Sequence, residues 1–227
     1  MSAAAALLDR LGRPGAVRLG APAPHPQARL PTALSDLDAA LGGGLPRGRV
    51  TELVGARSTG RTGIACRVMA GATRRGETAA WVDLEDALDP RALAAAGVLL
   101  PCLLWVRPPD RDDALRATEL LLGAGGFGLV VLDLGMYLPA PRRDARAAWI
   151  RLTRAAERTR STLLVLATAR QTGSCAALGL ELVSHRALWS GGPGRCPLLD
   201  GVAARLAVAR SRDGGAGRTV TLRQACA

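Results

Sequence analysis

The sequence RVTELVGARSTGRTGIACRVMAGATRR, residues 49–75, decides the fold of this chain. Its first six residues read as a strand, a loop of small residues follows up to Thr62, and residues 63–75 carry apolar side chains at helical spacing. A strand, a Gly-x-x-x-x-Gly loop and a helix bind phosphate, because the loop amides and the helix N-terminus attract an anion. The sequence therefore predicts a phosphate-binding loop that contacts its ligand through Gly55, Ser58, Thr59, Gly60, Arg61 and Thr62.

Arg61 stands where such a loop normally has lysine. Lysine places a compact charge between phosphates, whereas arginine is a wider planar fork, so the exchange is not conservative at an enclosed site. All thirty cationic residues of the chain are arginines. This bias in composition explains why position 61 is an arginine, but it does not explain how a guanidinium group would fit between phosphates. We expect ATP and Mg²⁺ to bind weakly or not at all, and hydrolysis to be largely lost.

Three carboxylates have positions that match this loop. Asp133 ends the apolar run 129–133, where it would hold Mg²⁺ together with Thr62. Glu85 follows the expected strand 78–83, where it would orient the attacking water if ATPase activity is retained. Asp89 lies where it would approach the ribose or the base of a nucleotide. For an Asp that follows an apolar strand, as Asp133 does, a capping or surface role is the competing interpretation.

The order of elements predicts an α/β fold with a mostly parallel sheet that has helices on both faces. Apolar strand candidates alternate with helical segments from residue 49 to residue 167. Segments 205–210 and 218–222 alternate around a Gly-rich turn and predict an antiparallel hairpin at the sheet edge. Residues 170–200 have little periodicity and predict an irregular surface excursion. We expect residues 1–30 to form a short helix and a Pro/Gly-rich arm, and residues 31–227 to form one domain.

The formal charge of +11 points to a polyanion or an acidic protein as a partner, or else to an arginine-rich surface without a specific partner. In the expected helix 142–160, five arginines fall within about 140° of arc at 100° per residue. These candidates for DNA or partner contact are Arg143, Arg146, Arg151, Arg154 and Arg158. A solvated helix face is the alternative. The scattered cysteines and the lack of a membrane-spanning stretch predict a reduced, cytoplasmic protein.

Several ordered motifs resemble the RecA-like ATPases. Residues 30–49 resemble the lead-in to the RecA core, residues 82–90 resemble its second strand and following turn, and residues 129–133 resemble its Walker B strand. The resemblance covers residues 30–170 and the closing hairpin. It implies a RecA-like core in which Glu85 is the catalytic glutamate.

The sequence departs from RecA at positions that bind the nucleotide, sense the γ-phosphate or bind DNA in RecA. Ala92 takes the place of the tyrosine that stacks on adenine, and Thr168-Ala169 takes the place of an Asn-Gln pair that senses the γ-phosphate, unless Gln171 compensates. The DNA-binding loops would be shortened or rewritten in residues 170–200. We expect no counterpart of the large C-terminal domain of RecA.

A RecA-like core with these departures resembles the ImuA (SulA-like) group of translesion-synthesis accessory proteins. That resemblance implies a largely non-enzymatic adaptor that contacts RecA, an inactive Y-family polymerase homologue (ImuB-like) and a replicative-type translesion polymerase. Two alternatives stay open at this point. One is a DNA-stimulated ATPase, a divergent recombinase paralogue, and the other is a simple DNA-binding module.

Overall fold

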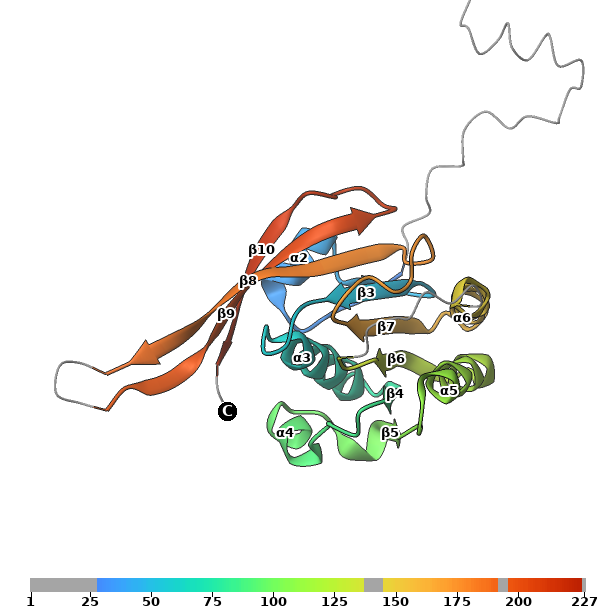
Figure 1. Cartoon of the computed structure of the whole chain (residues 1–227), viewed down its shortest axis with the longest axis horizontal. Helices are drawn as coiled ribbons and strands as arrows, with labels where there is room; N and C mark the ends of the chain where they lie inside the picture. The colour runs from blue at the N-terminus through green and yellow to red at the C-terminus, as the bar shows by residue number, and fades with distance from the viewer. Residues whose placement is uncertain (1–27, 137–144, 192–195, 226–227) are drawn as a thin grey trace, which may run out of the picture.

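An eight-stranded sheet crosses the body of the protein in the order β10-β9-β8-β3-β7-β6-β4-β5 (Figure 1). The computed structural model describes residues 28–136, 145–191 and 196–225. The strands of this sheet are β3 (Val50–Val54), β4 (Thr78–Asp83), β5 (Leu103–Val106), β6 (Phe127–Asp133), β7 (Thr162–Ala167), β8 (Leu178–Ser190), β9 (Leu198–Ser211) and β10 (Thr219–Ala225). The strands from β8 to β5 pair in parallel, while β9 and β10 pair antiparallel. The predicted α/β class with an edge hairpin is confirmed.

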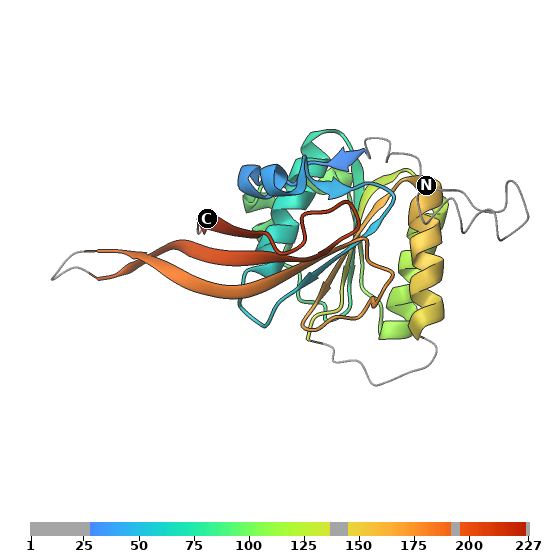
Figure 2. The ribbon, with the colours of Figure 1, turned by 90° about the horizontal axis from the view of Figure 1, so that it is seen from above.

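Helices cover both faces of the sheet (Figure 2). One face packs against α2 (Ser35–Leu41), α3 (Arg61–Arg74) and α4 (Pro90–Ala95), and the other packs against α5 (Arg111–Ala124) and α6 (Ala145–Thr159). Ile64 and Met69 of α3 are buried in the first core, and Trp149 and Leu152 of α6 are buried in the second. Because both faces are covered, the central strands are largely apolar. Within the described ranges, no helix combines the length and apolarity needed to cross a bilayer.

The strand register brings the ends of four strands to one edge of the sheet. Val54 lies beside Ala167, and Asp133 lies between Leu166 and Asp83. The loops that follow β3, β4, β6 and β7 therefore meet at the carboxyl edge of the sheet, which is where open α/β sheets bind their ligands.

The N-terminal boundary of the body lies slightly earlier than predicted. β1 (Arg29–Leu30) pairs antiparallel with β2 (Leu45–Pro46), and the Leu30 side chain is fully buried. Residues 29 and 30 therefore belong to the folded body and not to an arm. The helix predicted at residues 2–12 lies outside the described residues.

The irregular excursion predicted for residues 170–200 is wrong for most of its length. β8 begins at Leu178 and runs for 13 residues, and β9 begins at Leu198. The first residues of β8 lie in the core, whereas residues 183–187 are exposed. A strand with two exposed faces has no apolar alternation, so the sequence pattern did not reveal it.

Candidate phosphate-binding site

A pocket of about 430 Å³ opens at the carboxyl edge of the sheet, over the loop between β3 and α3. Five of the predicted site residues line it: Ser58, Gly60, Arg61, Thr62 and Glu85. The sequence had not indicated the other lining residues, which include Arg57, Ala87, Met136 and Val202. Met136 follows β6 and Val202 belongs to β9, so only the tertiary fold brings them to the loop.

The loop between β3 and α3 has the compact form that its small residues predict. Ser58 and Gly60 have left-handed backbones, with φ of 63° and 93°. The Thr59 hydroxyl donates to the Ala56 carbonyl oxygen at 2.8 Å and is buried beneath the loop. A Cβ on Gly55 would meet Thr59 Oγ1 at 2.7 Å, so a side chain at that glycine would disturb the loop. Gly55 and Thr59 therefore shape the loop without lining the pocket.

The Arg61 side chain forms a bridge within the protein. Its guanidinium donates from Nη1 to the Gly55 carbonyl oxygen at 2.9 Å and from Nη2 to the Gly135 carbonyl oxygen at 3.0 Å. The residue is only 8% exposed. Each of these hydrogen bonds has a charged donor, which makes it stronger than one between neutral groups. The planar fork thus ties the phosphate-binding loop to the turn after β6, a geometry that a single ammonium group does not offer.

The turn after β6, residues 133–136, is held from three directions. The Gly135 N–H donates to Asp133 Oδ1 at 2.9 Å, and the Met136 N–H donates to Glu85 Oε1 at 2.7 Å. Gly135 has φ of 58°, and a Cβ there would overlap the Glu85 carboxylate. With the Arg61 bridge, this turn engages three of the side chains to which a nucleotide role was assigned, those of Arg61, Glu85 and Asp133.

Burial raises the pKa of the Asp133 carboxyl above its ordinary value, and the carboxylates of Asp83 and Glu85 add to this effect. The Gly135 N–H and the Arg61 guanidinium offset part of the shift. Burial also raises the pKa of the nearby Cys66 thiol to about 11, with Asp133 adding to it, so Cys66 is a neutral thiol. In the described ranges, no group of three or more His, Cys, Asp or Glu side chains is arranged to hold a metal ion.

The Arg61 side chain is occupied by contacts within the protein. Its two terminal nitrogens are used by protein carbonyls, and its Nε is buried without a partner among the described residues. The charge of Arg61 is therefore paired with protein carbonyl oxygens in this structure. Thr62 is exposed at the pocket and retains the position expected of a magnesium ligand.

Asp89 and Ala92 lie outside the 430 Å³ pocket. Asp89 caps α4 by accepting a hydrogen bond from the Arg91 N–H at 2.8 Å. Ala92 lines a second cavity, of about 770 Å³, which reaches Thr62 and Cys66 of α3. The nucleotide role predicted for Asp89 stays a prediction.

Glu52 fixes the loop after β7 and was missed from the sequence. This glutamate on β3 is 3% exposed and accepts hydrogen bonds from the N–H groups of Gln171 and Thr172 and from the Thr172 hydroxyl, at 2.6, 3.0 and 2.8 Å. The Gln171 side-chain amide is buried and has no partner among the described residues. A carboxylate inside an apolar strand was the available signal, because a buried charge needs partners.

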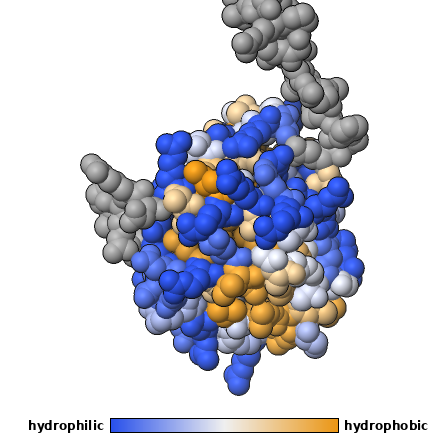
Figure 3. Space-filling view, turned by 90° about the vertical axis from the view of Figure 1, so that its right-hand side faces the viewer, coloured by the Kyte–Doolittle hydropathy of each residue, from blue (hydrophilic) through white to orange (hydrophobic). Residues whose placement is uncertain are grey.

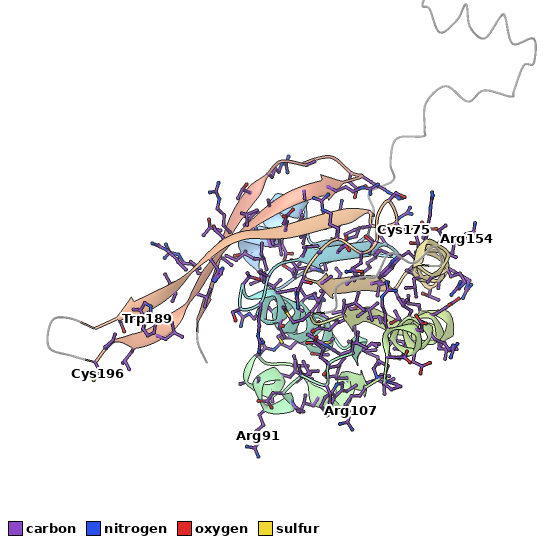
Figure 4. The ribbon with its side chains drawn as sticks, viewed as in Figure 1. Arg91, Arg107, Arg154, Cys175, Trp189 and Cys196 are labelled. Carbon is purple, nitrogen blue, oxygen red and sulfur yellow. The ribbon has the colours of Figure 1, made fainter. Side chains whose placement is uncertain are left out.

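Apart from Arg143, the arginines of the predicted basic helix lie on α6, and their predicted contact with DNA or a partner stays a prediction. Arg146, Arg154 and Arg158 are exposed, and they make no side-chain hydrogen bond or ion pair with any described residue. Arg151 instead pairs with Glu119 of α5 at 2.9 Å. Arg154 projects outward in Figure 4, and Figure 3 shows hydrophilic surface on this side above an apolar patch. Arg143 lies outside the described residues.

The strand, loop and helix place the chain in the class of P-loop α/β folds. The sequence model of the RecA N-terminal domain family matches residues 2–145, so the chain belongs to that family. It is 41% identical to Protein RecA of Arthrobacter sp. (strain FB24) over 135 residues, which are 59% of this chain and 38% of that protein. It is 36% identical to Protein RecA of Streptomyces rimosus over 135 residues, again 59% of this chain and 36% of the relative.

The chain thus spans less than two fifths of the length of these two relatives. The crystal structure of the RadB recombinase superposes with a TM-score of 0.66 at 21% identity, covering 86% of this chain and 95% of that one. This likeness confirms the RecA-like fold that the motifs predicted.

Proposed function

We propose that this protein is a RecA-fold adaptor in DNA damage tolerance that works without ATP turnover. Its proposed partners are RecA itself, an inactive Y-family polymerase homologue and a replicative-type translesion polymerase. The relationship to proteins named RecA supports a role near recombination and repair, and the narrower resemblance to the ImuA group supports the choice of partners.

The observation that carries this proposal is the inward bridge of Arg61. In a P-loop ATPase the lysine at this position holds the β- and γ-phosphates. Here the guanidinium spans the carbonyl oxygens of Gly55 and Gly135 at 2.9 and 3.0 Å. Binding a triphosphate through Arg61 would first break two charge-assisted hydrogen bonds in a buried place. The carbonyl oxygens of Gly55 and Gly135 contact the Arg61 guanidinium in place of a phosphate, so the loop is stable without a nucleotide.

Two further observations support a site without turnover. Glu85, the expected catalytic glutamate, accepts a hydrogen bond from the Met136 N–H and lies against Gly135. Ala92 offers no ring on which a base could stack. Each feature alone is compatible with a weak ATPase. Together with the inward bridge of Arg61, they leave the site without a side chain that grips the phosphates and without a ring that contacts the base.

Complex formation between purified components tests the adaptor role. Nuclease-treated protein is mixed with purified RecA, and separately with the Y-family homologue, and co-elution is followed by gel filtration with and without ATP. We expect a complex with at least one component that does not depend on nucleotide. The absence of any complex, or a complex that needs ATP, would contradict the proposal.

A DNA-stimulated ATPase is the second candidate. Thr62 and Glu85 line the same pocket, and Asp133 lies close enough to Arg61 and Glu85 for their charges to shift its pKa. Phosphate release in the presence of single-stranded DNA distinguishes the two functions. A rise in the rate with DNA would favour the ATPase, and no rise in either the wild-type protein or Arg61→Lys would exclude it.

A further inference from the structure

A projecting arm extends from the body beside the phosphate-binding loop (Figure 1). We use this name for residues 183–190 of β8 and 198–205 of β9. β8 pairs with β3 only from Leu178 to Glu181, and beyond that point it pairs with β9 alone. The outer edge of β8 in the arm therefore has no strand partner among the described residues. Its unpaired N–H and C=O groups are a template for one more strand.

The two faces of the arm differ in chemistry. Cross-strand pairs place Ala187 opposite Val202 and Trp189 opposite Leu199, on the face that also carries the buried Ala204. Val202 lines the phosphate-loop pocket, so this apolar face turns toward that loop. The opposite face carries both arginines of the arm, Arg186 across from Ala203 and Arg205 across from Ser184, together with Leu188 across from Gly201.

The apolar side chains of the arm are exposed to solvent, and its two arginines have no hydrogen-bond or ion-pair partner among the described residues. Trp189 is 61% exposed and Leu199 is 42% exposed, although side chains of this size are normally covered. Figure 4 shows Trp189 far out on the arm. Arg186 and Arg205 make no side-chain hydrogen bond or ion pair with any described residue, and Asp200 is the one carboxylate within the arm's residue ranges. Exposed tryptophan and arginine are the residues that most often dominate a protein interface.

We propose that the free edge of β8 binds an extended segment of a partner protein in which acidic and apolar residues alternate. Successive side chains of an added strand point to opposite faces of the sheet. Every second residue of the segment would therefore meet Trp189 and Ala187, and the residues between them would meet Arg186. This inference rests on the proposed adaptor function and names the chemistry of its partner.

A second copy of this chain fits the edge less well. Antiparallel pairing of two β8 edges centred on Ala187 would place Arg186 of each copy opposite Leu188 of the other. Both arginines would then lie on the same face in diagonal positions, and like charges so placed destabilise a sheet. The chain's net charge of +11 opposes self-association further. An acidic partner removes both costs.

A synthetic peptide provides the probe. It is a ten-residue peptide of alternating glutamate and valine with a fluorescein label, and its binding to the full chain is measured by fluorescence anisotropy. A peptide of the same composition, with five glutamates followed by five valines, controls for charge alone. The variants are Trp189→Ala and Arg186→Glu, both at exposed positions, and Arg160→Glu, an exposed arginine just after α6 and outside every candidate site, is the matched charge control.

We expect saturable binding of the alternating peptide that weakens about tenfold or more in Trp189→Ala and Arg186→Glu and stays unchanged in Arg160→Glu. The block peptide should bind at least several-fold more weakly. Equal binding of the two peptides, equal loss in Arg160→Glu, or no binding would overturn the proposal. A dimer in sedimentation velocity that Trp189→Ala dissolves would assign the edge to a second copy instead.

These outcomes are separate from those that test the adaptor function. ATP hydrolysis by the wild-type protein would overturn the adaptor proposal and leave peptide binding to the arm intact. Failure of the peptide to bind, with a nucleotide-independent complex still present, would place the partner on another surface.

Discussion

The single substitution Arg61→Lys tests whether the planar guanidinium group stabilises the phosphate-binding loop and prevents nucleotide binding. The change keeps the positive charge but removes the planar fork that spans the Gly55 and Gly135 carbonyl oxygens. A lysine ammonium group is compact and strongly hydrated, so it can replace one of these hydrogen bonds and not both at the same geometry. We therefore expect a less stable protein with a regained ability to bind Mg²⁺-ATP.

The magnitude follows from the buried carbonyl that loses its donor. A buried acceptor left without a partner costs about 1–3 kcal/mol, and Arg61 is 8% exposed, so solvent replaces little of the loss. A loss of about 2 kcal/mol lowers Tm by roughly 4–8 °C in a domain of this size. If Arg61→Lys binds Mg²⁺-ATP, ligand at one hundred times its Kd adds about 2.7 kcal/mol of stability.

Thermal unfolding with and without Mg²⁺-ATP measures both effects. Wild-type protein should show no shift with nucleotide, and Arg61→Lys should show a lower Tm that nucleotide raises. Arg61→Met should lose stability without any response to nucleotide, and Arg67→Lys, an exposed arginine on the same helix, should behave as the wild type. The reasoning is refuted if the wild-type Tm rises with Mg²⁺-ATP as much as that of the lysine variant.

Three further predictions concern other parts of the molecule. Glu77 receives two hydrogen bonds from Arg47, at 2.8 and 2.9 Å, and one from Arg75 at 3.1 Å, and its pKa is lowered because these bonds outweigh the effect of burial. Glu77→Gln should therefore lower the free energy of unfolding by about 1–3 kcal/mol at neutral pH, as measured by denaturant unfolding. The difference in stability between Glu77→Gln and the wild-type protein should vanish as the pH falls below about 4.3 through the lowered pKa of Glu77. A difference in stability that persists at low pH would contradict this account. Gly135→Ala should cost about 1–2 kcal/mol more than Gly76→Ala, since both have positive φ but only Gly135 lies against Glu85; equal losses in thermal unfolding would show that the contact is unimportant. Arg154→Glu with Arg158→Glu should weaken retention on a DNA column and reduce its salt dependence if α6 contacts phosphates, and unchanged retention would identify a solvated face.

The sequence was sufficient for the elements that lie in the core. The strands β3, β4, β6 and β7 and the order of helices followed from apolar runs, because both faces of these strands are largely buried. The phosphate-binding loop was equally clear, since its glycines and small residues are required by its backbone.

Features that depend on contacts distant in sequence could not be predicted. The Arg61 bridge joins residues 74 positions apart, and the hydrogen bonds to Glu52 join residues 119 and 120 positions apart. The exposed half of β8 lacks the alternation that marks a half-buried strand, and Asp89 caps a helix at a position where its residue type fits either role. Side-chain direction, which decides whether a charge serves a ligand or the fold, is set by tertiary packing.

The central claim is that the guanidinium of Arg61 does not serve as the phosphate grip of an ATP site. Isothermal titration calorimetry of the wild-type protein with ATP and Mg²⁺ measures this most directly. The account predicts no saturable heat, and saturable binding in the micromolar range by the unmodified chain would contradict it.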